Sequence, residues 1–387
     1  MPGFIIVMIV LLCAVGGATY YIAYRIYQGV LGLFPNAPFW PVLVFFVLMS
    51  LLMVFCFVGS VFSLPARVKY VLGCIGFSWM GIFLYLLLYT AGVDLLTLMP
   101  RLIKLHFTTL PSFKSYMSMT VLVLTAVTSI CGFWNARHTQ HVSYEVNLSG
   151  KADISDLQIV LISDLHLGSV GSEARLENIV NEINALKPDI VCIAGDFFDT
   201  DFGSIQDPER ALATMKKLRP VYGTYACLGN HDAGKTVSKM TAFLKEAGIH
   251  LLLDEAVTID NRLTIVGRLD ASPIGDYGNQ RRRNLSDFFT PEDPSLPVIV
   301  LDHNPGNVHT YGTDADLILC GHTHEGQLFP GSLITGAMYD VDYGYYRRDA
   351  QSPHVVVTSG VGYWGVPMRV GTQCEIVSIR CTSKEPS

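Results

Sequence analysis

The stretch Leu157-Gln158-Ile159-Val160-Leu161-Ile162-Ser163-Asp164-Leu165-His166-Leu167-Gly168 decides how the second half of the chain folds. Its first six residues are almost wholly apolar, which is typical of a buried strand. Side chains at positions i and i+2 of an extended segment point to the same side, so Asp164 and His166 are presented together where the strand ends. A carboxylate and an imidazole in this arrangement make half of a metal site.

Four later strands are predicted to end in the same way, each in a short polar cluster. A single Asp or His after a strand is more often a turn residue or a satisfied hydrogen-bonding group than a ligand. Five such clusters in series are hard to explain as turns, and sites in open α/β sheets gather at the carboxyl ends of strands. The four later clusters are Gly195-Asp196-Phe197-Phe198-Asp199, Gly229-Asn230-His231-Asp232, Asp302-His303-Asn304-Pro305 and Gly321-His322-Thr323-His324.

The ligand types in these clusters predict the chemistry of the site. Oxygen and nitrogen ligands without a thiolate suit Mn²⁺, Fe, Zn²⁺ or Mg²⁺. Seven candidates exceed the needs of one ion with open positions, but suit two ions bridged by one carboxylate. Two ions roughly 3.5–4 Å apart can clamp a phosphoryl group and generate hydroxide at neutral pH, which indicates hydrolysis of a phosphoester.

The rest of the second half alternates strands with helices and then becomes rich in strands. Helical spacing over 173–186, 209–218 and 237–247 alternates with apolar runs at 189–194 and 221–228, which favours βαβ units. Further short strands are expected at 250–253, 256–260, 263–267, 298–301, 317–320, 355–358 and 374–379. This pattern predicts an α/β fold in which two sheets pack together with helices outside.

The first 137 residues differ sharply in composition. At 387 residues the chain is long enough for two domains, and residues 1–137 contain four long windows without a charged residue. A membrane-spanning helix needs roughly 20 mostly apolar residues. We therefore predict a four-helix transmembrane region with spans near 4–24, 39–63, 70–91 and 116–134, then a connector at 138–156, a catalytic domain at 157–381 and a tail at 382–387. A cleaved signal peptide is the alternative for the first window.

Charge and cysteine usage limit the partners and the compartment. The formal charge of −6 argues against a nucleic-acid-binding protein. Ionisable residues are missing from the predicted span centres, which favours an anchor over a transporter. Basic residues flank both sides of the spans in similar number, so they do not orient the protein. Five of the nine cysteines fall in the second half without framework spacing, which favours a reducing, cytoplasmic compartment for that domain.

The five motifs, intact and in this order, resemble those of the calcineurin-like metallophosphoesterase superfamily over about 157–381. The later residues Gly360-Val361-Gly362, Pro367-Met368-Arg369-Val370-Gly371 and Glu375-Ile376 resemble the YkuE/YaeI-like subgroup of often membrane-attached phosphodiesterases. The resemblance implies a four-layer α/β/β/α sandwich, a binuclear metal centre and a preference for phosphodiesters.

The resemblance also implies a role for each motif residue. Asp164, His166 and His324 would bind the first metal, Asn230, His303 and His322 the second, and Asp196 both. His231 would protonate the leaving oxygen or stabilise the transition state, and Asp232 would orient it. Asp199 would hold a ligand by a hydrogen bond, with a loop cap as an equal alternative.

Three segments outside the motifs carry competing interpretations. The run Arg281-Arg282-Arg283 in the polar segment 270–296 is read as a solvated face, or as a binder of phosphate or an anionic lipid head group. Segment 337–348, with its tyrosines and arginines, would line a substrate groove or pack as a loop. The loop around Tyr363 and Trp364 would rest on the bilayer or pack internally.

We therefore predict a membrane-anchored, binuclear metal-dependent phosphodiesterase that cleaves a membrane-borne or lipid-linked phosphoester by attack of metal-bound hydroxide. One alternative is a non-catalytic scaffold or binding protein, which should have lost ligands, whereas this chain has kept all seven. The other alternative is the regulatory domain of a membrane transporter, which the charge-free span centres disfavour.

Overall fold

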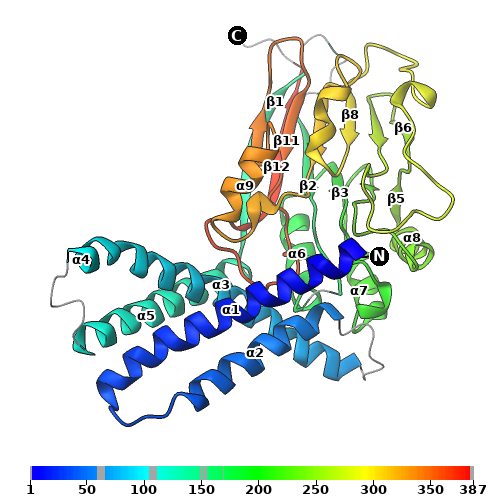
Figure 1. Cartoon of the computed structure of the whole chain (residues 1–387). Coiled ribbons are helices and arrows are strands. Elements are labelled where there is room, and N and C mark those ends of the chain that lie inside the picture. Colours follow the sequence, from blue (N-terminus) through cyan, green and yellow to red (C-terminus); the bar gives the residue numbers. More distant parts are fainter. Residues whose placement is uncertain are drawn as a thin grey trace. The chain divides into compact units, whose positions relative to one another are not determined.

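The structure is a computed structural model that describes residues 2–58, 66–103, 111–148, 151, 154, 156–168 and 170–383. The chain divides into two compact units, Met1–Phe133 and Trp134–Ser387 (Figure 1). Each unit has its own apolar core, so each is described by itself.

The first unit is helical. Its elements are α1 (Pro2–Leu33), α2 (Trp40–Val58), α3 (Ala66–Leu96), α4 (Leu98–Leu102) and α5 (Pro111–Asn135), the last of which extends into the second unit. Among the described residues, three helical segments are long and apolar enough to cross a membrane, namely Ile6–Leu33, Arg67–Leu96 and Ser112–Asn135. The apolar stretch of α2, Trp40–Cys56, is shorter, and residues 59–63 of the predicted second span lie outside the described residues. The count of four spans therefore stays a prediction.

The helices of the first unit run farther than the predicted spans. Arg25 and Asp94, which limit three of the charge-free windows, lie within α1 and α3 and form an ion pair. The hydroxyl of Tyr21 donates to the same carboxylate at 2.6 Å. The two charges thus compensate one another between helices instead of marking where the helices end.

The second unit is an α/β sandwich of two mixed six-stranded sheets, as predicted. One sheet has the order β1-β12-β2-β3-β4-β5 and the other the order β10-β11-β9-β8-β7-β6. The first sheet consists of β1 (Thr139–Asn147), β2 (Leu157–Ile162), β3 (Ile190–Ala194), β4 (Thr224–Cys227), β5 (Ile249–Leu251) and β12 (Cys374–Thr382). The second consists of β6 (Glu255–Ile259), β7 (Leu263–Gly267), β8 (Val298–Leu301), β9 (Leu317–Cys320), β10 (Gly344–Tyr346) and β11 (His354–Val357). The helices are α6 (Glu173–Ala185), α7 (Pro208–Met215), α8 (Val237–Glu246) and α9 (Gly331–Met338).

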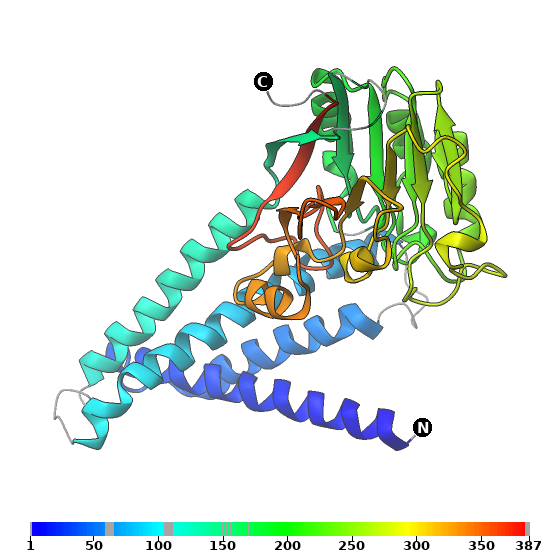
Figure 2. The ribbon, with the colours of Figure 1, turned by 90° about the horizontal axis from the view of Figure 1, so that it is seen from above.

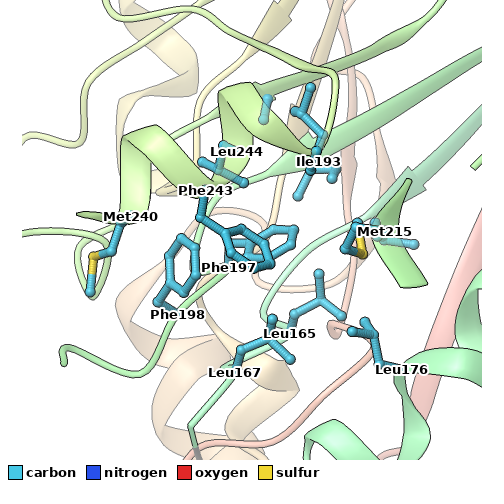
Figure 3. Close-up of a cluster of buried hydrophobic side chains, with 14 of the residues drawn as sticks. Leu165, Leu167, Leu176, Ile193, Phe197, Phe198, Met215, Met240, Phe243 and Leu244 are labelled. Carbon is cyan, nitrogen blue, oxygen red and sulfur yellow. The ribbon is translucent and has the colours of Figure 1, made fainter. Parts of the chain in front are cut away.

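Alternation along the central strands explains their apolar runs. In β2, Ile159 and Leu161 belong to the core between the two sheets, whereas Val160 and Ile162 belong to the core under the helices. Successive side chains of a strand point to opposite faces, so a strand buried on both faces must be apolar throughout. Figure 3 shows the second of these cores, where Phe197 and Phe198 lie against Phe243 of α8.

The predicted connector contains an edge strand that is longer than we expected. Alternation of side chains over Ser143 to Leu148 in the sequence predicts a short edge strand, whereas β1 spans Thr139–Asn147 and pairs in parallel with β12 along its whole length. In Figure 2, β12 is drawn in red beside β1. Because β1 is parallel to β12 and β12 is antiparallel to β2, β1 begins at the same end of the sheet at which β2 ends.

Candidate metal centre

The five polar clusters come from five strand ends, as predicted. Strands β2, β3 and β4 are parallel neighbours in the first sheet, and β8 and β9 are parallel neighbours in the second. Parallel neighbours bring their carboxyl ends to one edge, so the loops after all five strands can meet there. The seven predicted ligands do lie together at this edge, in two groups.

The first group consists of Asp164, His166 and His324, whose ligand atoms lie within 4.8 Å of one another. Nε2 of His324 is 3.1 Å from Nε2 of His166 and 3.3 Å from Oδ1 of Asp164. All three side chains are buried, and Oδ1 of Asp164 has no hydrogen-bond partner among the described residues. A buried carboxylate oxygen without a donor is costly, and a divalent cation would satisfy it.

The second group consists of Asp196, His303 and His322, again within 4.8 Å, with Asn230 beside them. Oδ1 of Asn230 is 3.1 Å from Nε2 of His303 and 2.9 Å from Nδ1 of His322. Nδ1–H of His303 donates to the carbonyl oxygen of Ala194 at 2.7 Å. That hydrogen bond fixes the tautomer of His303 and leaves the lone pair of Nε2 directed into the group.

Asp196 connects the two groups. Its Oδ2 lies 3.2 Å from Nε2 of His303 and 3.7 Å from Nε2 of His166. Its Oδ1 accepts the backbone N–H of His231 at 2.8 Å, which fixes the plane of the carboxylate. One oxygen of this side chain therefore faces both groups, which is the position that a bridging ligand requires.

Burial sets the protonation of the groups. It lowers the pKa of His166 to about 3 and that of His322 to about 4, so both imidazoles are neutral at pH 7 and can act as ligands. Burial raises the pKa of Asp164 to about 6. Burial alone would also raise the pKa of Asp196, but His303 lowers it, and Asp196 in turn raises the pKa of His303. Divalent cations would displace the proton of His303 and keep Asp164 ionised.

The backbone at the ligands is unusual. Five of the seven have a positive φ, between +46° and +75°: Asp164, His166, Asp196, His322 and His324. Glycine provides the space that these turns require. A Cβ at Gly321 would overlap the side chains of Ser163 and Asp164, and one at Gly195 would lie 2.7 Å from Nδ1 of His303.

The surroundings of His231 correct one prediction. Asp232 does not orient this imidazole; its buried carboxylate accepts the backbone N–H groups of Phe197, Phe198 and Gly229 at 2.8–3.1 Å. Asp232 therefore holds together the loops that follow β3 and β4. Nδ1 of His231 lies instead 2.8 Å from Oγ1 of Thr200 and 3.7 Å from Oδ1 of Asp199. Asp199 is also 3.7 Å from Nδ1 of His166, which is too long for the expected hydrogen bond, so its support of a ligand stays a prediction.

The arginine run divides: Arg281 and Arg283 are exposed, as a solvated face predicts, whereas Arg282 is partly buried in an ion pair. The guanidinium of Arg282 makes two hydrogen bonds to the carboxylate of Asp302, at 2.7 and 3.0 Å, and donates to the carbonyl oxygen of Leu269. Arg283 binds the backbone oxygen of Asp254, and only Arg281 is exposed without a contact of this kind among the described residues. Asp302 precedes His303, so Arg282 fixes the end of β8 from which that predicted ligand extends.

Several side chains of segment 337–348 and of the loop around Tyr363 form hydrogen bonds within the second unit. These contacts favour packed loops over an open substrate groove. Tyr343 donates to Glu375 at 2.9 Å, Tyr345 contacts His354 at 2.8 Å, and Arg347 donates to nearby carbonyl oxygens. The hydroxyl of Tyr363 donates to the carbonyl oxygen of Val170 at 2.6 Å, so this ring is buried and not at a surface. Trp364 is different: it is exposed, and its ring centroid lies 5.8 Å from that of His231.

Two residues of the site have no motif that identifies them. Thr200 follows the second motif directly, but threonine at a loop position gives no signal of its own. Arg369 is fully buried, and its guanidinium donates to Nδ1 of His324 at 3.0 Å and to the carbonyl oxygen of His324 at 2.9 Å. The sequence could indicate Arg369 only through the later block that resembles the YkuE/YaeI-like subgroup.

A two-sheet α/β sandwich with histidine and carboxylate groups at its strand ends is the architecture of the metallophosphoesterase class. Residues 157–326 match the family described as calcineurin-like phosphoesterases. A metallophosphoesterase of Aquifex aeolicus is 32% identical over 231 residues, which cover 59% of this chain and 87% of that protein. The chain belongs to the calcineurin-like metallophosphoesterase family.

One further relative is similar over more of the chain than the second unit, and two others are similar over 59% of it. A zebrafish (Danio rerio) transmembrane protein with a metallophosphoesterase domain is 28% identical, covering 80% of this chain and 73% of that protein. A metallophosphoesterase of Helicobacter pylori is 30% identical, covering 59% of this chain. The chain spans only 60% of the length of that relative. The UDP-2,3-diacylglucosamine pyrophosphatase LpxG of Chlamydia trachomatis is 25% identical, covering 59% of this chain and 85% of that protein.

Proposed function

We propose that this protein is a membrane-anchored phosphodiesterase that uses two divalent cations to cleave a lipid-linked phosphoester. The main observation behind the proposal is the position of Oδ2 of Asp196 between two groups of ligand-type side chains. The imidazoles that it faces would bind a cation in their neutral form. Asp164, His166 and His324 would hold one cation, Asn230, His303 and His322 the other, and Asp196 both. When bound, such cations polarise phosphoryl oxygens and lower the pKa of water.

The protein's own groups would position the leaving oxygen and supply its proton. His231 is held by the contact of its Nδ1 with Thr200 and by the bond from its backbone N–H to Asp196. Nε2 is the remaining nitrogen of the ring, and from there the imidazolium would donate a proton to the departing oxygen. Trp364, beside the same ring, would exclude water from one side of that transfer.

A lipid-linked substrate is the part of the proposal that the membrane region supports. Three helices in the described part of the chain are apolar enough to cross a bilayer, and two-dimensional confinement favours a substrate in the same membrane. LpxG, by its name, acts on a diacylated sugar nucleotide, so a lipid pyrophosphate or phosphodiester is a reasonable chemical class for this chain as well. A cytoplasmic location of the second unit is likewise part of the proposal, because its five cysteines show no framework spacing.

The test is hydrolysis by the purified full chain supplied with Mn²⁺. Bis-p-nitrophenyl phosphate should be cleaved faster than p-nitrophenyl phosphate, and Asn230→Ala or His231→Ala should abolish most of the diester rate. His141→Ala is the matched control, because His141 is an exposed histidine of β1 that pairs with Glu182 away from the motifs. Unchanged turnover in Asn230→Ala and His231→Ala would refute the assignment. A monoester preference would refute the phosphodiesterase part alone.

A further inference from the structure

Helix α9 is an apolar helix without a buried residue. Its sequence, Gly331–Met338, contains Leu333, Ile334 and Met338 at 65%, 61% and 69% exposure, and Phe329 just before it is also exposed. Between 328 and 339 the chain has no charged residue. We call Phe329, Leu333, Ile334 and Met338 the α9 patch. Soluble domains rarely expose a group of large apolar side chains of this kind, and such a surface usually binds a protein, a membrane or a ligand.

The α9 patch is held at the rim of the metal centre. Thr323, between the predicted ligands His322 and His324, donates to the carbonyl oxygen of Asp342 at 2.6 Å. Thr335 of α9 donates to the carboxylate of the same aspartate at 2.7 Å. Tyr339, directly after the helix, has its ring centroid 6.2 Å from that of His322. The helix is therefore fixed relative to the predicted ligands, although its apolar side chains contact little.

The chain enters the second unit at the same edge. Helix α5, which is apolar enough to cross a membrane, ends at Asn135, and β1 begins at Thr139 opposite Cys374. Asn135 donates to the carbonyl oxygen of Arg369 at 3.3 Å, and Ala136 packs with Tyr363 and Cys374. Arg369 in turn binds His324. Only residues 136–138 separate an apolar helix from the sheet edge that carries the metal centre and the α9 patch.

We propose that the α9 patch binds the acyl chain of the lipid-linked phosphoester while the phosphoryl group lies at the metal centre. The inference rests on the proposed function and specifies where the apolar part of the substrate is recognised. We assign a lipid chain to the α9 patch because this apolar surface lies at the same end of the strands as the junction between α5 and β1, and α5 is apolar enough to cross a membrane. The exposed Trp364, whose backbone is hydrogen-bonded in both directions to Gln327, would cover the part of the chain nearest the leaving oxygen.

The experiment compares two soluble phosphodiesters that differ only in their apolar tail, ethyl p-nitrophenyl phosphate and decyl p-nitrophenyl phosphate. With full chain in nanodiscs and Mn²⁺, kcat/KM for the decyl ester should exceed that for the ethyl ester by about tenfold or more, since each buried methylene favours binding. Leu333→Gln/Ile334→Gln should reduce this ratio to within about threefold while keeping the ethyl ester rate. Val221→Gln is the matched control, an equally exposed apolar residue before β4 at the opposite edge of the sheet.

The possible outcomes separate the two proposals. If neither ester is cleaved by the wild-type chain, the proposed function fails. If both are cleaved and the double variant keeps the wild-type ratio, the α9 patch binds something other than the acyl chain and the inference is overturned. It is also overturned if the ethyl ester rate falls as much as the decyl rate, since the substitutions then act on the metal centre. Met338→Gln provides an independent second variant with the same expectation.

Discussion

Replacing Arg282 by methionine should destabilise the second unit without touching the metal ligands. The side chain of Arg282 is 17% exposed and that of Asp302 is fully buried, and two hydrogen bonds join them. The hydroxyl of Tyr311 also donates to Asp302 at 2.6 Å, but it carries no charge. Arg282→Met would therefore leave a buried carboxylate with one neutral donor in place of its ion pair.

The expected cost follows from the burial of the pair. Breaking a buried ion pair by removing one partner costs about 3–5 kcal/mol. Because Arg282 keeps some contact with solvent, the lower end of that range applies, about 3 kcal/mol. At 1.4 kcal/mol for each factor of ten, the population of the unfolded second unit should rise by about 100-fold. Arg282→Met/Asp302→Asn removes the buried charge as well, and should recover at least about tenfold of that loss.

The buried thiol of Cys320 measures this change inside the intact membrane protein. Cys320 ends β9, the strand beside β8, and it is fully buried. When reclosing is faster than labelling, its rate of modification by a thiol reagent reports the open population. Peptide mass spectrometry would separate Cys320 from the cysteines of the first unit. The control is Arg281→Met, the exposed neighbour in the same run, which should change labelling by less than about threefold.

A wild-type labelling rate in Arg282→Met would refute this reasoning. If Arg282 instead bound the phosphate of the substrate, the variant would raise KM and leave the protection of Cys320 unchanged. The ion pair and the anion site therefore predict opposite patterns in two measurements on one variant.

Three further substitutions test the site itself. His231→Ala should lower kcat by about 10²–10⁴ while the metal content, measured by elemental analysis, stays that of the wild type. Thr200→Val removes the contact with Nδ1 of His231 and should lower kcat by about tenfold, with no additional loss in the double variant with His231→Ala. Gly321→Ala should reduce the metal-to-protein ratio, because the new Cβ would displace the carboxylate of Asp164; an unchanged ratio would count against Asp164 as a ligand.

The sequence predicts the central strands well because both of their faces are buried. Ile159 and Val160 belong to different cores, so neither position tolerates a polar side chain. The apolar run of β2 can therefore be recognised as a buried strand without knowing the fold. The clusters that follow these strands are short and local, so the predicted ligands could be identified one motif at a time. Their convergence then follows from parallel pairing, which brings the carboxyl ends together.

Elements stabilised by distant contacts could not be predicted in the same way. Arg282 is 20 positions from Asp302 and Arg369 is 45 positions from His324, so nothing local in the sequence reports either pair. Helix α9 has glycine at its first residue and at Gly336 and also contains a threonine, all poor helix formers, and no buried side chain gives it a helical period. No helix is therefore predicted over Gly331–Met338, although its position beside the metal motif gives it a proposed role.

The left-handed backbone at five of the predicted ligands is a conformational cost that the folded protein must offset. A positive φ raises the conformational free energy of a non-glycine residue by roughly 1–2 kcal/mol. Five such positions in one site therefore require other interactions that stabilise this backbone. Part of this stabilisation comes from the fixed surroundings, such as the three N–H bonds that Asp232 accepts across two of these loops. Cation binding to Asp164 and Asp196 would supply the rest, since it acts on the folded state alone. The strain at Asp164, His166, Asp196, His322 and His324 is thus better explained by a metal centre than by a structural role for these turns, which could have used glycine at every position.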